Sequence, residues 1–183
     1  MTAAVSAPPV PSPEETRDNA AFLALMWALA RPGTVHELPE PDVLPLALAL
    51  VDLECRVMAD DPGLAARIAE TGARLATAPM ADHAFLAVAD KALGVLAQLP
   101  AGTALYPDHG ATLVLPAVIG RGERLRLTGP GISGQAEIAL RGLPPGFFDL
   151  RAERCSYPAG IEIVFVDGAR IVALPRSTRV EVL

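Results

Sequence analysis

The hydrophobic and polar positions alternate with helical periodicity soon after the start of the chain. Ser12-Pro13-Glu14-Glu15 combines a capping serine, a proline suited to the first turn and a glutamate that completes a capping box. Phe22, Leu25, Met26 and Leu29 then recur at a spacing of three and four residues and give one apolar face. This pattern predicts a helix that ends at the Pro-Gly step of residues 32–33.

The same periodicity predicts the remaining elements. Helices are expected over about 42–53, 61–69 and 90–99, with a weaker one over 145–154, and strands over about 55–58, 84–88, 111–119, 123–128, 135–140, 161–166, 170–174 and 179–182. Asp167-Gly168-Ala169 is a hairpin signal between two of these strands. Alternating helices and strands, followed by a strand-rich end, predict a single α/β domain over 14–183, with a mixed sheet flanked by helices. The proline-rich residues 1–13 are expected to form a flexible tail.

Composition narrows the class of protein. Hydrophobic residues make up 51% of the 183 residues and aromatic residues only 4%, so the core is expected to consist of small aliphatic side chains. The apolar runs are shorter than the roughly 20 residues of a membrane span, and no basic segment precedes an early apolar stretch. Cys55 and Cys155 are isolated, which argues against a disulfide framework or a zinc site. We therefore expect a cytoplasmic protein with no membrane association.

The charged residues exclude further classes of protein. The net charge is −6, and residues 121–183, with nine arginines and seven acidic residues, are too weakly basic for a nucleic-acid surface. Lys91 is the single lysine and lies in a predicted amphipathic helix, where a surface role is expected. A pyridoxal-phosphate enzyme, which needs a lysine for its Schiff base, is therefore disfavoured.

The glycine-rich segment Gly129-Pro130-Gly131-Ile132-Ser133-Gly134 matches G-x-G-x-x-G. A dinucleotide site requires a long helix after this motif, with its N-terminus facing the pyrophosphate. Here the short stretch 135–140 runs into a Gly-Leu-Pro-Pro sequence. A hairpin loop is favoured, and the phosphate loop stays an alternative.

A second candidate for anion binding follows the strand predicted at 170–174. Arg176, Ser177 and Thr178 offer a guanidinium, two hydroxyls and backbone amides that could hold an oxyanion. Arg124 and Arg126 share one strand face and could contribute. The alternatives are a polar connecting loop and a surface that contacts a partner.

No catalytic or metal-binding constellation is predicted. His36, His83 and His109 are scattered, and metal ligands must converge. Asp108 and His109 form the best general-base candidate, although an exposed loop histidine is the more common situation. We expect no metal, no cofactor and no catalytic residue.

Several blocks, in this order, resemble one known family from about residue 14 to the C-terminus. They are FLALMWALARPG at 22–33, PDHGATL at 107–113, RLRLTGPGI at 124–132, Phe147, YPAGIE at 157–162 and ALPRSTRVEV at 173–182. Together they are similar to the H subunit of the bacterial carbon–phosphorus lyase (the PhnH family). One departure is Leu23, where the family commonly has a basic residue.

The resemblance implies a fold like the large domain of pyridoxal-phosphate-dependent transferases, without the cofactor. It also implies a homodimer that joins the G, I and J subunits in a core complex. That complex couples ATP and methylphosphonate to form α-D-ribose 1-methylphosphonate 5-triphosphate, and the chain would be a non-catalytic or co-catalytic subunit of it. Two alternatives stay open: a free-standing enzyme for nucleotides or phosphate esters that uses the loops Gly129–Gly134 and Arg176–Thr178, and a small cofactor-free binding protein.

Overall fold

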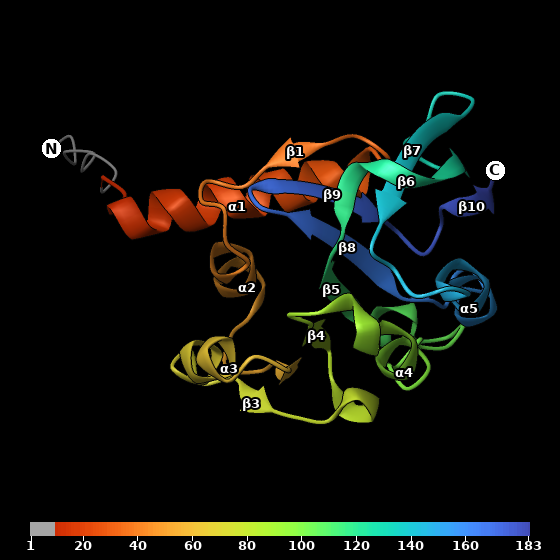
Figure 1. Ribbon diagram of the computed structural model, residues 1–183. Coiled ribbons are helices and arrows are strands. Elements are labelled where there is room, and N and C mark those ends of the chain that lie inside the picture. Colours follow the sequence, from red (N-terminus) through yellow and green to blue (C-terminus); the bar gives the residue numbers. More distant parts are fainter. Residues whose placement is uncertain (1–9) are drawn as a thin grey trace, which may run out of the picture.

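A computed structural model describes residues 10–183 (Figure 1). The helices are α1 (Pro13–Ala30), α2 (Leu44–Leu50), α3 (Pro62–Ala69), α4 (Ala92–Leu96) and α5 (Phe147–Arg154), with 3₁₀ turns at Ala78–Met80, Ala89–Lys91 and Pro107–His109. The strands are β1 (His36–Glu37), β2 (Arg56–Ala59), β3 (Arg74–Leu75), β4 (His83–Phe85), β5 (Thr112–Pro116), β6 (Val118–Thr128), β7 (Ala136–Arg141), β8 (Glu162–Asp167), β9 (Arg170–Leu174) and β10 (Arg179–Val182).

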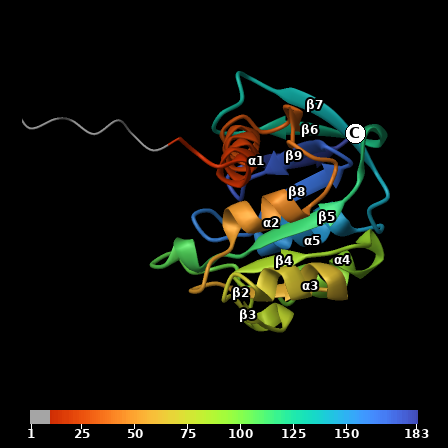
Figure 2. The ribbon, with the colours of Figure 1, turned by 90° about the vertical axis from the view of Figure 1, so that its left-hand side faces the viewer.

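The centre of the fold is a seven-stranded mixed sheet. Its order is β1-β9-β8-β5-β4-β2-β3, and Figure 2 shows it from β9 near the top to β3 at the bottom. Strands β3, β2, β4, β5 and β8 are parallel, whereas β9 runs antiparallel to both of its neighbours. The predicted α/β class with a mixed sheet is therefore confirmed.

Successive side chains of the central strands enter two different cores, as the pleat of a strand requires. Phe85, Val114 and Val164 pack with α1, α2 and α3 on one face. Leu113 and Phe165 pack on the other face with α4, α5 and a separate antiparallel sheet, β10-β6-β7. This second sheet was not predicted.

The predicted strand at 111–119 is divided between the two sheets. Its first part is β5, and after Pro116 the chain enters β6, which crosses to the small sheet. An irregular register between Ile119 and Glu123 bends β6 at this point, as bulges commonly do. Periodicity within the run could not show this change of sheet, because both halves are apolar.

Helix α1 begins as predicted. The Ser12 hydroxyl accepts from the Glu15 backbone N–H, and the Glu15 carboxylate accepts from the Ser12 N–H. Its buried face is different from the predicted one, however, because Phe22 and Met26 are exposed and the buried side chains are Ala21, Ala24, Leu25 and Ala28. Small side chains let α1 approach the sheet closely. The predicted tail lies outside the described residues over 1–9, and Pro13 belongs to α1.

Other helices are shorter than predicted. The segment at 42–53 is helical only over Leu44–Leu50, and the segment at 90–99 is a 3₁₀ turn followed by five residues of α4. The predicted hairpin at 161–174, the helix at 62–69 and the pairing of 123–128 with 135–140 are confirmed. No helix among residues 10–183 has the length and apolarity needed to cross a membrane.

Candidate functional site

Polar side chains gather where the parallel strands begin. Arg56, His83, Thr112 and Glu162 start β2, β4, β5 and β8, which lie side by side in register. Because β9 runs antiparallel, the loop that follows it arrives at this same edge and brings Arg176. A hollow of about 560 Å³ lies here, lined by Arg56, Asp82, His83, Pro100, Asp108, His109, Gly110, Thr112, Glu162 and Arg176. We call this the amino-edge hollow.

Arg56 and Asp82 form the first ion pair of this hollow. The Arg56 Nη2 atom lies 2.5 Å from Asp82 Oδ1, and the Arg56 Nε and backbone N–H both donate to Oδ2. Burial by itself would raise the pKa of Asp82, but the hydrogen bonds and charge of Arg56 outweigh it and hold that pKa below its usual value. The carboxylate is therefore ionised, and both of its oxygens accept hydrogen bonds from Arg56.

Arg176 and Glu162 form the second pair. The Arg176 backbone N–H donates to Glu162 Oε2 at 2.8 Å, its Nε donates to Oε1 at 2.5 Å, and its Nη1 donates to the Pro107 carbonyl. Both side chains are mostly buried. The guanidinium predicted to bind an anion is therefore engaged with a carboxylate in this state of the protein.

The two histidines of the hollow come from distant parts of the chain. His83 Nδ1 is buried and has no hydrogen-bond partner among residues 10–183. Burial lowers the pKa of His83, and the charges of Asp82 and Asp52 only partly oppose this. His109 stacks on Tyr106 with 5.3 Å between ring centroids, and it lies exposed 3.9 Å from Asp108. The structure thus brings together two histidines that their spacing did not connect.

Beside Arg176, the loop 175–178 is fixed by a buried arginine that the sequence did not single out. Arg151 of α5 is 2% exposed, and it donates to the carbonyls of Pro175 and Thr178 at 2.7 and 3.1 Å. Burial lowers the pKa of Arg151. Thr178 is buried, and its hydroxyl has no hydrogen-bond partner among the described residues. A hollow of about 640 Å³ between α5 and this loop is lined by Phe148, Arg151, Ala152, Cys155, Tyr157, Arg176, Ser177, Thr178, Arg179 and Val180.

The other two arginines predicted to contribute lie on the small sheet. Arg124 donates to Glu137 at 2.7 Å, and Arg126 donates to Glu181 at 2.9 Å. These pairs form across neighbouring strands, so both guanidinium groups are engaged away from Arg176. The structure places Arg124 and Arg126 in a charged sheet face and does not gather them around the 175–178 loop.

The glycine-rich segment at 129–134 joins β6 to β7, so the hairpin interpretation is confirmed. Its glycines permit close backbone approach. A Cβ at Gly131, which has φ of 81°, would lie 2.2 Å from the Ala30 carbonyl, and one at Gly129 would lie 2.8 Å from the Ser177 carbonyl. The segment therefore rests against the end of α1 and against the 175–178 loop.

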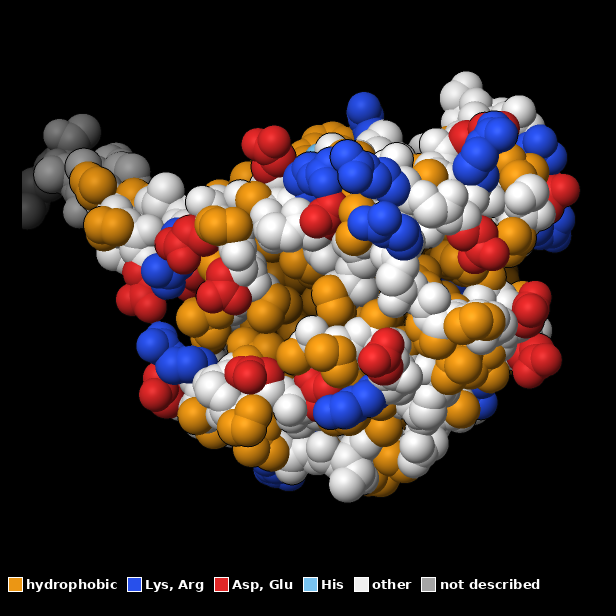
Figure 3. Space-filling model, viewed as in Figure 1, with side chains coloured by type: hydrophobic (Ala, Val, Ile, Leu, Met, Phe, Trp, Pro, Cys, Tyr) orange, Lys and Arg blue, Asp and Glu red, His pale blue; other side chains and the backbone are white. Residues whose placement is uncertain are grey.

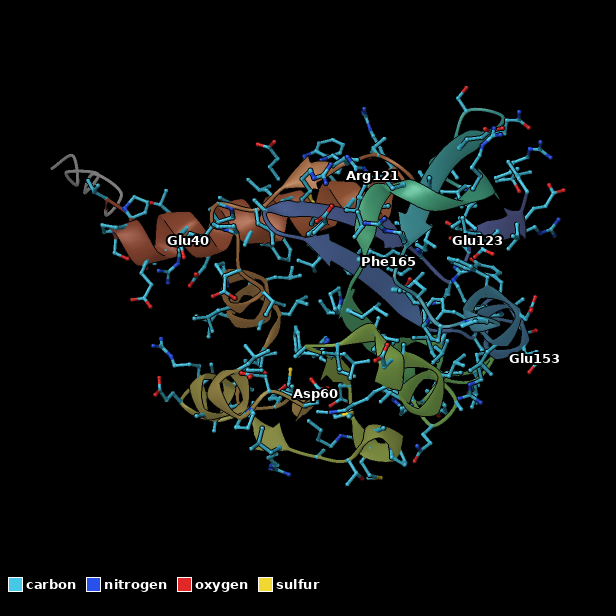
Figure 4. All side chains as sticks on the ribbon, viewed as in Figure 1. Glu40, Asp60, Arg121, Glu123, Glu153 and Phe165 are labelled. Atoms are coloured by element: carbon cyan, nitrogen blue, oxygen red, sulfur yellow. The ribbon has the colours of Figure 1, made fainter. Side chains whose placement is uncertain are left out.

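The opposite, carboxyl edge of the parallel strands is mostly apolar. A hollow of about 570 Å³ lies between α2, α3 and the end of β4, lined by Asp42, Val43, Leu44, Asp61, Gly63, Leu64, Arg67, Leu86 and Ala87. Figure 3 shows hydrophobic side chains gathered in the hollowed area around α2. Asp60, labelled in Figure 4, follows β2 at this edge; its carboxylate accepts from the Ala87 N–H at 2.6 Å and from Lys91 at 3.0 Å.

Within residues 10–183, no three His, Cys, Asp or Glu side chains are placed to hold a metal ion together. Cys55 and Cys155 are free thiols. In the amino-edge hollow, Arg56 and Arg176 are paired with carboxylates. In the hollow beside α5, the buried Arg151 contacts backbone carbonyls.

Comparison with known proteins gives a consistent result. Residues 13–181 match the family model described as bacterial phosphonate metabolism protein (PhnH). A protein of Stutzerimonas stutzeri named as a C-P lyase subunit, HtxG, is 32% identical over 170 residues, which cover 90% of this chain and 86% of that protein. Alpha-D-ribose 1-methylphosphonate 5-triphosphate synthase subunit PhnH of Rhizobium meliloti (strain 1021) is 32% identical over 179 residues, covering 87% and 88%.

Proposed function

The chain belongs to the bacterial phosphonate metabolism (PhnH) family, and from this membership we propose that it is a subunit of the carbon–phosphorus lyase core complex. In that role it supports formation of α-D-ribose 1-methylphosphonate 5-triphosphate from ATP and methylphosphonate. The observation that carries the proposal is the extent of the family match, which runs from the start of α1 into β10.

We propose that the protein works in the cytoplasm as a homodimer that joins the G, I and J subunits. The names of both relatives, which are subunits of an enzyme, support dependence on partners. The state of the amino-edge hollow supports a non-catalytic or co-catalytic role, because Arg56 and Arg176 are neutralised by Asp82 and Glu162.

Co-expression tests this proposal directly. The chain, carrying an affinity tag, should co-purify with untagged G, I and J subunits as one stable complex. The purified chain alone should not convert ATP and methylphosphonate. Failure to recover the other subunits, or substantial turnover by the isolated chain, would each contradict the proposal. A matched control expresses the same tag on an unrelated protein.

We further propose that the seven-stranded sheet is related to the large domain of pyridoxal-phosphate-dependent transferases, without the cofactor. Lys91 is consistent with this, because its ammonium donates to the buried carboxylate of Asp60 at 3.0 Å. An ammonium held by a carboxylate at a strand end is a structural ion pair and not a free amine for Schiff-base formation.

A second candidate function is binding of a phosphate ester or nucleotide by the loops Gly129–Gly134 and Arg176–Thr178. Contact of Gly129 with Ser177 supports it, because the two loops form one surface. The buried guanidinium of Arg151 and the Thr178 hydroxyl, which has no hydrogen-bond partner within residues 10–183, lie beside the same loop and also support it.

Two substitutions distinguish this function from a purely structural loop. Arg176→Ala should weaken binding of phosphate and methylphosphonate, measured by calorimetry, and leave assembly intact. Glu162→Gln removes the competing carboxylate charge, so it should strengthen the same binding. If neither variant changes anion affinity, the loop is not an anion site. If Arg176→Ala abolishes assembly of a folded chain, the loop is an interface.

A further inference from the structure

The hollow between α5 and the loop before β10, which we call the α5 hollow, is lined by basic and neutral side chains. The described residues around it include Arg151, Arg176 and Arg179, and none of them is Asp or Glu. The acidic residues of α5 itself, Asp149 and Glu153, each lie two positions from Arg151, which places them on the opposite side of the helix. The α5 hollow is therefore a region of positive charge.

Arg151 is a buried cation without a carboxylate partner. Its side chain is 2% exposed, it donates to the carbonyls of Pro175 and Thr178, and it makes no ion pair with residues 10–183. The nearby carboxylate of Glu162 is itself paired with Arg176. A buried cation of this kind attracts an anion, because its surroundings screen the charge less than water does.

Hydrogen-bond donors suited to an oxyanion border the same hollow. Arg179 is exposed and makes no ion pair with residues 10–183, so its guanidinium can turn toward a ligand. Ser177 contributes a partly exposed hydroxyl. Thr178 is 3% exposed, and its hydroxyl has no hydrogen-bond partner among the described residues, which is rare for a buried polar group. Guanidinium and hydroxyl donors in this combination bind phosphoryl groups.

Part of the lining is apolar. Phe148, Ala152 and Val180 form a wall beside the arginines, and the ring of Tyr157, which is 75% exposed, also borders the hollow. An inorganic anion would leave this apolar surface in contact with water, whereas an organic group would cover it. A ligand that carries both a phosphoryl group and an organic body therefore uses both parts of the lining.

We propose that the α5 hollow binds the phosphoryl group of an organic phosphate ester, with Arg179 and Ser177 as its direct contacts. Arg151 acts through its charge and by holding the loop. The inference rests on the second candidate function above and places the ligand on the α5 side of the loop. Arg176 lines both this hollow and the amino-edge hollow, so substitution of Arg176 does not tell the two apart. Arg179 lines only the α5 hollow of the two and distinguishes them.

Calorimetry with phenyl phosphate and the full-length protein tests this assignment. Arg179→Met should raise the dissociation constant at least about tenfold, because it removes a charge-assisted hydrogen bond to the phosphoryl group. Arg121→Met is the matched control. Arg121 is an exposed arginine of β6 without an ion pair to residues 10–183, and Figure 4 shows it well apart from Glu153 of α5. Its substitution should change the affinity less than about twofold. Inorganic phosphate should bind more weakly than phenyl phosphate, because it cannot cover the apolar wall.

Alkylation of the two free thiols locates the ligand without any substitution. Cys155 lines the α5 hollow, whereas Cys55 lines neither this hollow nor the amino-edge hollow. Saturating phenyl phosphate should slow the reaction of Cys155 with iodoacetamide several-fold and leave that of Cys55 unchanged. Mass spectrometry of the two labelled peptides measures both rates in one sample.

The possible failures are distinguishable. If Arg179→Met leaves the affinity unchanged, or if Cys155 reacts equally fast with and without phenyl phosphate, the α5 hollow is not the site. Weakening by Arg176→Ala alone would then place the anion at the amino edge, which overturns this inference and leaves the second candidate function standing. Equal weakening by Arg121→Met, or inorganic phosphate bound as tightly as the ester, also overturns it. Absence of binding at millimolar phenyl phosphate and phosphate overturns both, while co-purification with the G, I and J subunits is a separate result.

Discussion

The two edges of the parallel strands differ in how many charged side chains they carry and in how these are paired. At the amino edge, Arg56 and Arg176 each bind a carboxylate, and nearby Arg151 is held by backbone carbonyls. At the carboxyl edge, the buried carboxylate of Asp60 pairs with Lys91, and the hollow beside it is lined mainly by aliphatic side chains. Arginine–carboxylate pairs thus line the amino-edge hollow, whereas the hollow at the carboxyl edge is lined mainly by apolar side chains.

This difference follows from the direction of one strand. In open parallel sheets, ligands usually bind at the carboxyl ends, where the loops between strands and helices gather. Here β9 is antiparallel, so its following loop, with Arg176 and Thr178, reaches the amino edge. A single reversed strand therefore moves the polar loop to the edge that is normally structural. Each prediction below tests whether the two edges depend on their charges to different degrees.

The largest effect is expected at Arg151, which holds the amino-edge loop. Arg151→Met keeps much of the side-chain volume but removes the donors to the Pro175 and Thr178 carbonyls. Leaving buried carbonyls unpaired should lower the free energy of unfolding by about 2–3 kcal/mol. Urea denaturation measures this change. Arg179→Met, at the exposed first residue of β10 directly after this loop, is the control and should change stability by less than about 0.5 kcal/mol. Equal effects of the two substitutions would show that the loop does not depend on Arg151.

A smaller effect is expected at the carboxyl edge. Asp60→Ala removes the acceptor of the Ala87 N–H, and the side chain is only 7% exposed, so we expect a loss of about 1–2 kcal/mol. Lys91→Met removes only the ammonium, which is 57% exposed, and should cost less than about 0.5 kcal/mol. The pair of variants, compared by urea denaturation, separates the backbone hydrogen bond from the ion pair. A loss as large for Lys91→Met as for Asp60→Ala would contradict this division.

The parts of the fold that the sequence predicted are those with local causes. The capping box at Ser12 and the turn at Asp167–Ala169 each depend on residues a few positions apart, so the pattern alone indicates them. The buried face of α1 differs from the predicted one, because a helix that is apolar on all sides carries no signal for which side packs against the sheet. The division between β5 and β6 likewise depends on two sheets packing together, which a continuous apolar run does not reveal.

The candidate site was predicted less completely, because its contacts join residues far apart in the chain. The sequence indicates Arg176 as a candidate anion-binding residue, but Glu162 becomes its partner only through the β8–β9 hairpin. His83 and Asp82 reach the hollow because β4 lies between β2 and β5. Arg151 carried no motif at all; an arginine in a weakly helical segment is ordinarily a surface residue. Parallel register, which brings strand starts together, has no local signature.

The smallest effect is a pH dependence confined to the amino edge. Burial lowers the pKa of His83 in the folded protein, so between that value and about 6.5 the unfolded chain binds more protons than the folded one. Stability from this group is complete above about pH 6.5 and is lost as the pH falls below it, with a slope of at most about 1.4 kcal/mol per pH unit. The lowered pKa of Asp82 acts separately, because its contribution is lost only below about pH 4. His83→Leu should therefore flatten the curve of unfolding free energy just below about pH 6.5 and leave the acid limb below about pH 4 unchanged. An unaltered slope in that variant would show that His83 is not the group whose protonation opposes folding, and that the amino edge is held by its ion pairs alone.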